Sequence, residues 1–511
     1  MTSSKNKRII KNTLFLYIRM FIVLIISLYT SRIILNTLGI KDYGIYSTIA
    51  GFVSMFAFIN ATLSASMQRF YNYEGTQTGL EGYKKVYTCG LVIHLIIGVI
   101  LFVLLETFGL WYVNNIMVIP SDRLYAANIV FQFSTLSLLF LIFQIPYVGA
   151  ILATEKMNYY SIVSIIDIIC RLICVLLLSH ISHDKLIIYS VLLFIITVFN
   201  FLLYVIYAKK YILHFKFYWK FDMEFFNKIL FFSGWNLLGT FSFLLKGQGI
   251  NILLNLYFGP LINAARGIAY QINSAVTNFT NNITMAYRPQ IVNSYSENNM
   301  ERVKSLFFSE SKICFALITV LIIPIIHEIE YILKIWLGTV PEYTNIFSIL
   351  ILIDSLICTL NTPCSQVISA TGQIKKFQIA SSVVNICLMP ASWICLEKGL
   401  DASSVFIATI CFSILNQIIC LIILKNYFKF EYSHYIKEII LPCFKFCFFL
   451  IAITIPIKYI FPDSLLRLLL VVFTTVILGC ISAYYIILNE EEKKNISKII
   501  KNKIKWLKYQ S

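Results

Sequence analysis

The sequence is poor in charge and has no long polar stretch. Of its 511 residues 13% are charged and 59% are hydrophobic, whereas soluble globular chains carry about 25% charged residues. Acidic residues are the scarcer sign, at 25 against 42 lysines and arginines. The low charge argues against a soluble globular protein, and the lack of long polar loops leaves no room for a separate catalytic domain.

Metal-ligand spacings and disulfide frameworks are also missing. The thirteen cysteines lie mostly inside apolar runs, and none forms a CxxC pair or a Cys/His cluster. We interpret them as packing residues and predict no cofactor and no metal site. The apolar run behind the basic N-terminus has no small-residue cleavage site, so we interpret it as a retained membrane helix.

Long apolar runs fill the chain instead. A membrane-spanning helix needs about 20 apolar residues, and lipid leaves every backbone polar group to be satisfied within the helix. The fold class that we predict is an all-α polytopic membrane protein with about 14 transmembrane helices. The predicted spans are residues 14–38, 43–66, 86–113, 124–151, 157–178, 186–208, 229–257, 261–286, 303–326, 343–367, 376–396, 402–424, 436–460 and 465–488.

Lysines and arginines are distributed unevenly between the two sets of loops. Most lie in the loops on the side of both termini, which the positive-inside rule places in the cytoplasm. We therefore expect a multi-pass membrane protein with both termini cytoplasmic. Topology accounts for much of the net charge of +17, so nucleic acid is not an expected partner. Membrane lipids are expected partners, with anionic headgroups at the lysine-rich C-terminal tail.

Residues 38–71 are similar to residues 258–295. Each segment begins at an apolar residue followed by glycine, continues into a helix rich in Ser, Thr and Asn, and ends near an arginine. The offset of about 220 residues predicts a parallel repeat of two lobes, with a cavity between them that opens to alternate sides. The predicted domains are an N-terminal six-helix lobe (1–208), a basic cytoplasmic linker (209–228), a C-terminal six-helix lobe (229–430), an extra helix pair (431–489) and a basic cytoplasmic tail (490–511).

The span predicted at 261–286 carries a stripe of polar residues. Steps of three or four residues place the stripe on one face of a helix. Its members are Arg266, Tyr270, Asn273, Thr277, Asn281 and Thr284. Unpaired polar groups cost several kcal/mol each in hydrocarbon, so this face must contact protein or water. Hydrogen bonding between helices is one interpretation. The one we favour is the wall of a hydrated cavity.

Several cations also lie within or beside the predicted spans. Charges inside a membrane usually face the bundle interior and mark a pathway or an ion pair. Lys246 lies near mid-span and is followed by Gly247 and Gly249, which we expect to bend or break the helix. Cations favour an anionic cargo, and the planar fork of arginine suits phosphate. The predicted cargo-binding cations are Arg19, Arg32, Lys246, Arg266, Arg69 and Arg288.

Acids inside the spans are fewer. Asp167 and Arg171 are spaced i, i+4, so they are candidates for a structural ion pair or for an ion-coupling site. The same two interpretations apply to Asp354. Glu310 and Lys312 lie near the end of a predicted span, where we expect their side chains to extend to the membrane surface.

Two stretches resemble a known family. They are "GIKDYGIYSTIAGFVSMF" (39–56) and "NLYFGPLINAARGIAYQINSAVTNFTNNITMAYRPQIVNSY" (255–295). Together with the fourteen-span layout they resemble the polysaccharide-biosynthesis flippases of the multidrug/oligosaccharidyl-lipid/polysaccharide exporter (MOP) superfamily. The resemblance implies a non-enzymatic transporter that moves an undecaprenyl-diphosphate-linked oligosaccharide, as for O-antigen or lipopolysaccharide, to the periplasmic leaflet. It also implies a cavity lined by helices 1, 2, 7 and 8. Candidate partners are the lipid-linked oligosaccharide diphosphate, polysaccharide polymerase, glycosyltransferases and an H⁺ or Na⁺ coupling ion.

Three alternatives remain open. A drug/cation antiporter of the same superfamily would hold its cargo with intramembrane carboxylates, which cations outnumber here. A membrane enzyme such as a polymerase or ligase would favour a large outer loop or a cluster of catalytic acids, and the sequence has neither. A scramblase-like lipid channel is compatible with the same composition.

Overall fold

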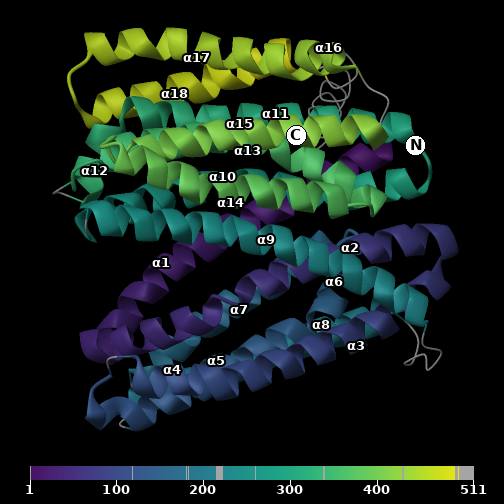
Figure 1. Ribbon diagram of the computed structural model, residues 1–511, viewed down its shortest axis with the longest axis vertical. Helices are drawn as coiled ribbons and strands as arrows, with labels where there is room; N and C mark the ends of the chain where they lie inside the picture. Colours follow the sequence, from purple (N-terminus) through teal and green to yellow (C-terminus); the bar gives the residue numbers. More distant parts are fainter. Residues whose placement is uncertain are drawn as a thin grey trace, which may run out of the picture. The chain divides into compact units, whose positions relative to one another are not determined.

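The computed structural model describes residues 2–493 apart from 118, 180, 182, 214–221, 259, 338, 339, 428–430 and 489–492. Every regular element in these residues is a helix (Figure 1), and the fourteen predicted spans all fall on helices. In the described part of the chain, twelve helices are long and apolar enough to cross a membrane. The all-α, multi-pass class is therefore confirmed. The polar helix α10 is not among the twelve, because its amides and hydroxyls lower its hydropathy.

The helices form two compact units. Among the described residues, the N-terminal unit comprises those of 8–241, and the C-terminal unit comprises those of 242–493 together with 2–7. The chain passes from one unit to the other within helix α9 (Met223–Phe258). In the predicted linker 209–228, residues 214–221 lie outside the described part, as does almost all of the tail 490–511. The division into lobes, linker, helix pair and tail stays a prediction.

The N-terminal unit contains eleven helical elements before α9. They are α1 (Thr2–Ser54), α2 (Ala57–Thr78), α3 (Leu80–Leu104), η1 (Leu105–Gly109), α4 (Leu110–Asn115), η2 (Ser121–Arg123), α5 (Leu124–Phe143), α6 (Ile145–Ala153), α7 (Met157–Leu178), α8 (Lys185–Ala208) and η3 (Lys209–Leu213). Side chains of α1, α7 and α8 share a buried apolar cluster around Ile34, Val175 and Leu193. Helices α3, α5 and α8 lie side by side (Figure 1).

Helix α1 contains the turn that separates the first two predicted spans. At this turn Gly39 adopts φ 77° and ψ 166°, outside the helical region. A side chain is disfavoured at this φ, so glycine permits the kink between the spans. Near the turn, Arg123 binds Asp42 of α1 and Asp184 ahead of α8, with a shortest Nη1–Oδ2 distance of 2.7 Å to Asp184. This clasp ties three segments of the N-terminal unit together.

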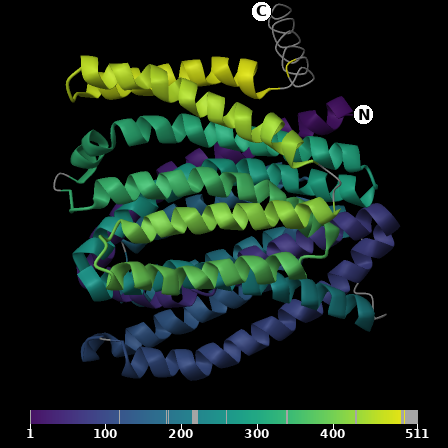
Figure 2. The ribbon, with the colours of Figure 1, turned by 45° about the horizontal axis from the view of Figure 1, so that its top comes forward.

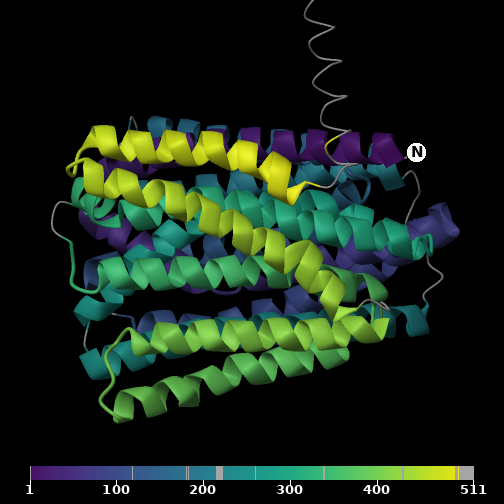
Figure 3. The same ribbon diagram turned by 90° about the horizontal axis from the view of Figure 1, so that it is seen from above.

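The C-terminal unit contains the second part of α9 and eleven further elements. They are α10 (Pro260–Ser296), α11 (Met300–His327), α12 (Ile329–Leu337), α13 (Thr344–Thr371), α14 (Lys375–Glu397), α15 (Ser404–Tyr427), α16 (Tyr432–Tyr435), η4 (Ile436–Ile440), α17 (Leu441–Ile460), α18 (Leu465–Ser482) and η5 (Ala483–Ile487). Helices α9, α10, α13, α14 and α15 share a buried cluster that includes Leu254, Ala269 and Phe347. Figure 3 shows α14 and α15 side by side.

The last two long helices, α17 and α18, run side by side (Figures 1 and 2) and pack on α11. An ion pair supports the contact between α18 and α11. Arg467 at the start of α18 donates to Glu328, the residue that follows α11, over 2.7 and 2.8 Å. Glu328 is 1% exposed and Arg467 5%. A second carboxylate, Asp463, lies 2.6 Å from Arg467. The paired guanidinium fork compensates for the cost of burying the charges.

Two helices continue well past their predicted ends. We predicted that the second and eighth spans end at residues 66 and 286, whereas α2 continues to Thr78 and α10 to Ser296. Hydropathy marks only the apolar part of a helix, so polar continuations are missed. As a consequence Arg69 and Arg288 belong to helices.

Candidate functional site

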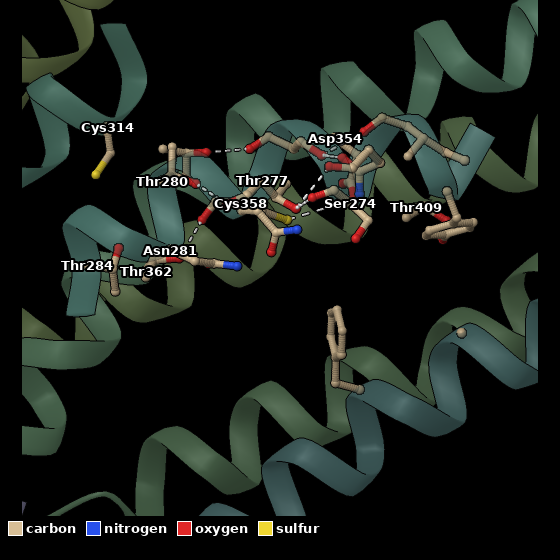
Figure 4. Close-up of a pocket in the computed structure, with 18 of the residues that line it drawn as sticks. Ser274, Thr277, Thr280, Asn281, Thr284, Cys314, Asp354, Cys358, Thr362 and Thr409 are labelled. Atoms are coloured by element: carbon tan, nitrogen blue, oxygen red, sulfur yellow. Dashed lines mark hydrogen bonds between the residues drawn. The ribbon is translucent and has the colours of Figure 1, made fainter. Parts of the chain in front are cut away.

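The C-terminal unit contains a pocket of about 520 Å³ that is lined mostly by polar residues. Three helices supply most of its wall. Helix α10 contributes Arg266, Tyr270, Asn273, Ser274, Thr277, Asn278, Thr280, Asn281 and Thr284; α13 contributes Ile351, Asp354, Ser355, Cys358, Thr359 and Thr362; and α9 contributes Phe243, Lys246 and Gly247. Cys314 of α11 and Thr409 of α15 complete the lining. Figure 4 shows the labelled hydroxyls and amides of α10 beside Asp354 and Cys358.

The pocket follows the polar stripe of α10 along its whole length. All six residues of the predicted stripe, from Arg266 to Thr284, line it. At a helical rise of 1.5 Å per residue, these eighteen steps span about 27 Å, close to the thickness of a bilayer core. The pocket therefore extends along one side of α10.

Arg266 is held in place near one end of the stripe. Its Nη2 donates to the backbone carbonyl of Gly247 over 2.7 Å, and its Nη1 donates to Asn251 Oδ1 over 3.2 Å. The guanidinium carbon lies 4.5 Å from the centroid of the Tyr270 ring, a cation–π distance. These contacts fix the direction of the cation, which needs little further ordering to meet an anion.

Lys246 and Asp354 supply the other two charges. Lys246 comes from α9 and lies within Coulombic range of Asp354 on α13. Asp354 Oδ2 lies 3.8 Å from the Cys358 thiol, and its Oδ1 has no hydrogen-bond partner among the described residues. Two cations and one carboxylate give the pocket a formal excess of positive charge. We expected the glycines beside Lys246 to bend or break the helix. Helix α9 is not broken, and it is continuous from Met223 to Phe258. Its backbone hydrogen bonds tolerate both glycines.

Hydroxyls and amides on α10 and α13 are joined across the pocket. Ser355 donates to Asn273 Oδ1, and Thr277 donates to the Asn273 carbonyl over 2.9 Å. Interhelix bonding and a cavity wall were alternative interpretations of the stripe, and the structure contains both. Asn273 bonds to the neighbouring helix, whereas Asn281 is exposed in the pocket.

The structure brings together only part of the predicted site. Lys246, Arg266, Tyr270, Asn273, Thr277, Asn281 and Asp354 line the pocket. Arg288 lies one helical turn beyond its last α10 residue, Thr284. Arg19, Arg32 and Arg69 belong to the N-terminal unit, and the Arg32 side chain lies outside the described part. The role of each residue in binding stays a prediction.

In the N-terminal unit the predicted residues contact aromatic rings or other charges. The guanidinium of Arg19 lies 5.1 Å from the Tyr160 ring. Arg69 is only 4% exposed and lies 4.7 Å from the ring of Phe70. Arg171 Nε lies 2.9 Å from Asp167 Oδ2, so the i, i+4 pair is present. Asn200 donates to the other oxygen of Asp167 over 2.6 Å.

Sequence reasoning identified Asp354 but missed the rest of the α13 wall. Ser355, Cys358, Thr359 and Thr362 also line the pocket and, together with Asp354, follow helical spacings of three or four residues. A search for a second polar stripe would have found them. The expectation for Glu310 and Lys312 was wrong, because they are 0% and 2% exposed and do not reach the surface. α11 packs against α10, α13 and α17, which cover both side chains.

No metal site or disulfide is present in the described part of the chain. No group of three or more His, Cys, Asp or Glu side chains there could hold a metal ion. All thirteen cysteines are free thiols. The groups that line the pocket are charged side chains, hydroxyls, amides, aromatic rings and the thiols of Cys314 and Cys358.

Comparison with known proteins gives structural likeness only. No family model matches the sequence, and no curated protein is similar to it. The fold is similar to MATE in its bent conformation, with a TM-score of 0.71 at 13% identity over 83% of this chain and 96% of that one. It is also similar to an outward-facing multidrug resistance MATE family transporter of the MOP superfamily, with a TM-score of 0.68 at 13% identity over 83% and 96% of the two chains.

A third solved structure is a MOP superfamily transporter from Pyrococcus furiosus. Its TM-score is 0.62 at 14% identity over 82% of this chain and 96% of that one. The reverse polarity of that protein's binding pocket is described as suggesting a different function. At such identities the likeness shows the fold, which is that of MATE transporters.

Proposed function

We propose that this chain is a transporter that moves an undecaprenyl-diphosphate-linked oligosaccharide from the cytoplasmic to the periplasmic leaflet by alternating access. The protein would lie in the bacterial inner membrane with both termini in the cytoplasm. The shared fold supports a transporter of the MOP superfamily, because its solved representatives are transporters. The cargo is inferred from the pocket and from the sequence resemblance, since fold alone does not define function.

The observation that carries the proposal is the excess of positive charge in the pocket of the C-terminal unit. Lys246 and Arg266 outnumber the single carboxylate of Asp354 there. A cargo with a diphosphate offers two negative charges to these cations, and the fork of arginine suits phosphate oxygens. The Asn, Ser and Thr side chains of α10 and α13 can exchange hydrogen bonds with sugar hydroxyls.

The volume of the pocket favours the head group over the whole repeat unit. A cavity of about 520 Å³ falls within the range of small-molecule sites, about 300–1,000 Å³. We infer that the diphosphate and the first sugars bind here, while the lipid chain stays in the bilayer. Polysaccharide polymerase and glycosyltransferases would act on the same cargo, and H⁺ or Na⁺ is the candidate coupling ion.

A drug/cation antiporter is the second candidate, and Asp354 favours it. This carboxylate lies in the pocket with one oxygen unpartnered among the described residues, as expected for a group that binds a cation or a proton. The two functions make opposite demands on charge. An antiporter needs Asp354 and is hindered by Lys246 and Arg266, whereas a flippase needs the cations.

Deletion of the gene tests the proposal in the native cell. We expect loss of surface polysaccharide and accumulation of lipid-linked repeat units that face the cytoplasm. Complementation with the wild-type gene should restore the polysaccharide, and complementation with Lys246→Ala/Arg266→Ala should not. Unchanged polysaccharide together with increased sensitivity to cationic drugs would refute the flippase and support the antiporter.

A further inference from the structure

Glu310 of α11 is a fully buried acid just beyond the end of the pocket that Thr284 lines. Its side chain is 0% exposed. Gln366 of α13 donates to Glu310 Oε1 over 2.9 Å and also reaches the Thr284 carbonyl of α10 at 3.4 Å. Thr284 and Cys314, the last pocket residues at this end, both lie next to the carboxyl. The acid therefore terminates the polar pocket.

One cation faces this carboxyl. Arg288 lies within Coulombic range of Glu310, and it follows Thr284 by four residues, so it continues the pocket stripe of α10 by one turn. The groups that face Glu310 are Arg288 and Thr284 from α10, Gln366 from α13 and Cys314 from α11 itself. Lys312 is two positions away, on nearly the opposite side of α11, where it lies within Coulombic range of Cys443 on α17.

The environment can hold the carboxyl in either protonation state. When Glu310 is ionised, Arg288 neutralises it and the Gln366 amide donates to it. When Glu310 is protonated, burial in the helix bundle favours the neutral acid, and Gln366 can still bond to it. Oε2 has no hydrogen-bond partner among the described residues, so a proton can be carried there.

We propose that Glu310 is a reversible proton-binding site whose protonation frees Arg288 to bind an anionic group of the cargo. With Glu310 ionised, its negative charge offsets the charge of Arg288, and the Thr284 end of the pocket attracts anions weakly. A proton on Glu310 leaves the positive charge of Arg288 uncompensated, beside the hydroxyl of Thr284. Proton uptake and anion binding then favour each other, since linkage between two sites is reciprocal.

The binding of an anionic cargo at Arg288 rests on the proposed function. This binding also fixes the direction in which affinity changes with pH. Glu310 is ionised above its pKa and protonated below it. Anion binding at Arg288 stabilises the protonated acid, so affinity is high at low pH and falls as pH rises. In the range where Glu310 titrates, Kd should rise by up to about tenfold per pH unit, the limit for one linked proton.

Calorimetry on the purified full chain in detergent tests the coupling. The probe is uridine diphosphate glucose, a diphosphate diester whose charge is constant across neutral pH. Titration in two buffers of different ionisation enthalpy gives the protons taken up per ligand bound. We expect about one proton for the wild type, because one acid changes state. Glu310→Gln keeps a partner for Gln366 and should bind independently of pH, without proton uptake.

A matched control and a second variant make the result specific. Glu106 in the N-terminal unit also accepts a hydrogen bond from a glutamine, Gln132, over 3.0 Å, so Glu106→Gln removes a similar acid and should behave as the wild type. Arg288→Gln should weaken ligand binding at every pH. Binding without proton uptake in the wild type, or uptake that persists in Glu310→Gln, overturns the proposal.

Infrared difference spectroscopy tests the proton site without a ligand, so it distinguishes failure of the proton site from failure of the proposed anionic cargo. We expect a protonated-carboxyl band that titrates with pH in the wild type, is missing in Glu310→Gln and is present in Glu106→Gln. In Arg288→Gln the titration should move to higher pH, because a cation that stabilises the carboxylate is lost. Absence of the band overturns the proton site. A titrating band with no ligand binding at any pH keeps the proton site and overturns the anionic cargo.

Discussion

Arg266 of α10 donates to the backbone carbonyl of Gly247 of α9 over 2.7 Å. The bond fixes a cation in the pocket wall by a main-chain group of a neighbouring helix. Stacking on Tyr270 orients the same guanidinium. The positive charge of the pocket is therefore set by helix packing before any cargo binds, and such preorganisation reduces the entropy lost on binding.

Replacement of Arg266 by lysine should impair transport although the charge is kept. Lysine lacks the planar fork, so the bonds to Gly247 and Asn251 cannot both form. We expect at least about a tenfold loss of transport and a loss of about 1.5–3 kcal/mol of unfolding free energy, the usual value for a hydrogen bond to a charged group. Surface polysaccharide and thermal unfolding report the two effects. Lys334→Arg on the exposed face of α12 is the control, and wild-type transport by Arg266→Lys would refute this role.

Cysteine substitutions should map the water in the pocket. In a background without native cysteines, Thr277→Cys and Asn281→Cys should react with a charged, water-soluble thiol reagent, because both positions line the pocket. Ile252→Cys is the control. The Ile252 side chain is 54% exposed on an apolar helix that we expect to face lipid, where such a reagent does not partition. Protection of both pocket positions, measured by mass shift in membranes, would show that the stripe is packed and dry.

Lys246 and Asp354 should be energetically coupled. Removal of Lys246 leaves the carboxylate in the pocket without its nearest compensating charge, so Lys246→Ala should cost more than it does in an Asp354→Asn background. A double-mutant cycle of thermal unfolding should give a coupling energy of about 0.5–3 kcal/mol. A coupling of zero would show that the two groups do not interact.

The same variants separate the two functions. Asp354→Asn should retain polysaccharide export if the cargo is anionic, whereas a cation antiporter would lose transport. Lys246→Ala should do the reverse. Both measurements can be made in one deletion strain, with surface polysaccharide and drug resistance as the outputs.

The clasp at Arg123 should make stability depend on acid pH. Burial alone would raise the pKa of Asp184, but hydrogen bonds from Arg123 and from the backbone N–H groups of Ile187 and Leu186 outweigh it and hold this pKa below its ordinary value. A depressed pKa contributes stability above the unfolded-state pKa, about 3.9 for aspartate, and this stability is lost as pH falls through the folded-state pKa. Thermal unfolding below about pH 4 should show the loss.

Asp184→Asn should unfold at a lower temperature at neutral pH and show a weaker acid dependence. Glu81→Gln, in the exposed first turn of α3, removes an acid of the same unit without touching the clasp and should keep the wild-type dependence. An Asp184→Asn curve parallel to that of the wild type at every pH would contradict the assignment.

Removing one partner of the buried pair Glu328 and Arg467 should lower the free energy of unfolding strongly, whereas replacing both partners should lower it little. Glu328→Gln leaves a buried guanidinium short of its main partner, for which a loss of about 3–5 kcal/mol is usual. Replacement of both residues by apolar ones of similar size, Glu328→Leu/Arg467→Met, should restore most of this loss. Thermal unfolding of the single and double variants is the test, and equal destabilisation by both would contradict the prediction.

The sequence was most informative where a pattern repeats along one helix. All fourteen spans fall on helices, and the stripe from Arg266 to Thr284 lines one pocket. Both results follow from periodicity, because apolar length identifies a spanning helix and a spacing of three or four residues identifies a face. The ends of α2 and α10 were missed because polar helical turns outside the apolar core have no hydropathy signal.

Tertiary structure alone decided which side chains lie opposite the polar face of α10. The fold class, the spans and the polar face of α10 are properties of a local pattern, and the chain determines them residue by residue. That Lys246, Asp354 and Arg266 share one pocket, while Arg19 and Arg69 belong to the other unit, depends on contacts between helices far apart in sequence. The burial of Glu310 against Gln366 is of the same kind. The sequence of one helix shows which side chains share a face, but only the packing of the helices determines which other helix contacts that face.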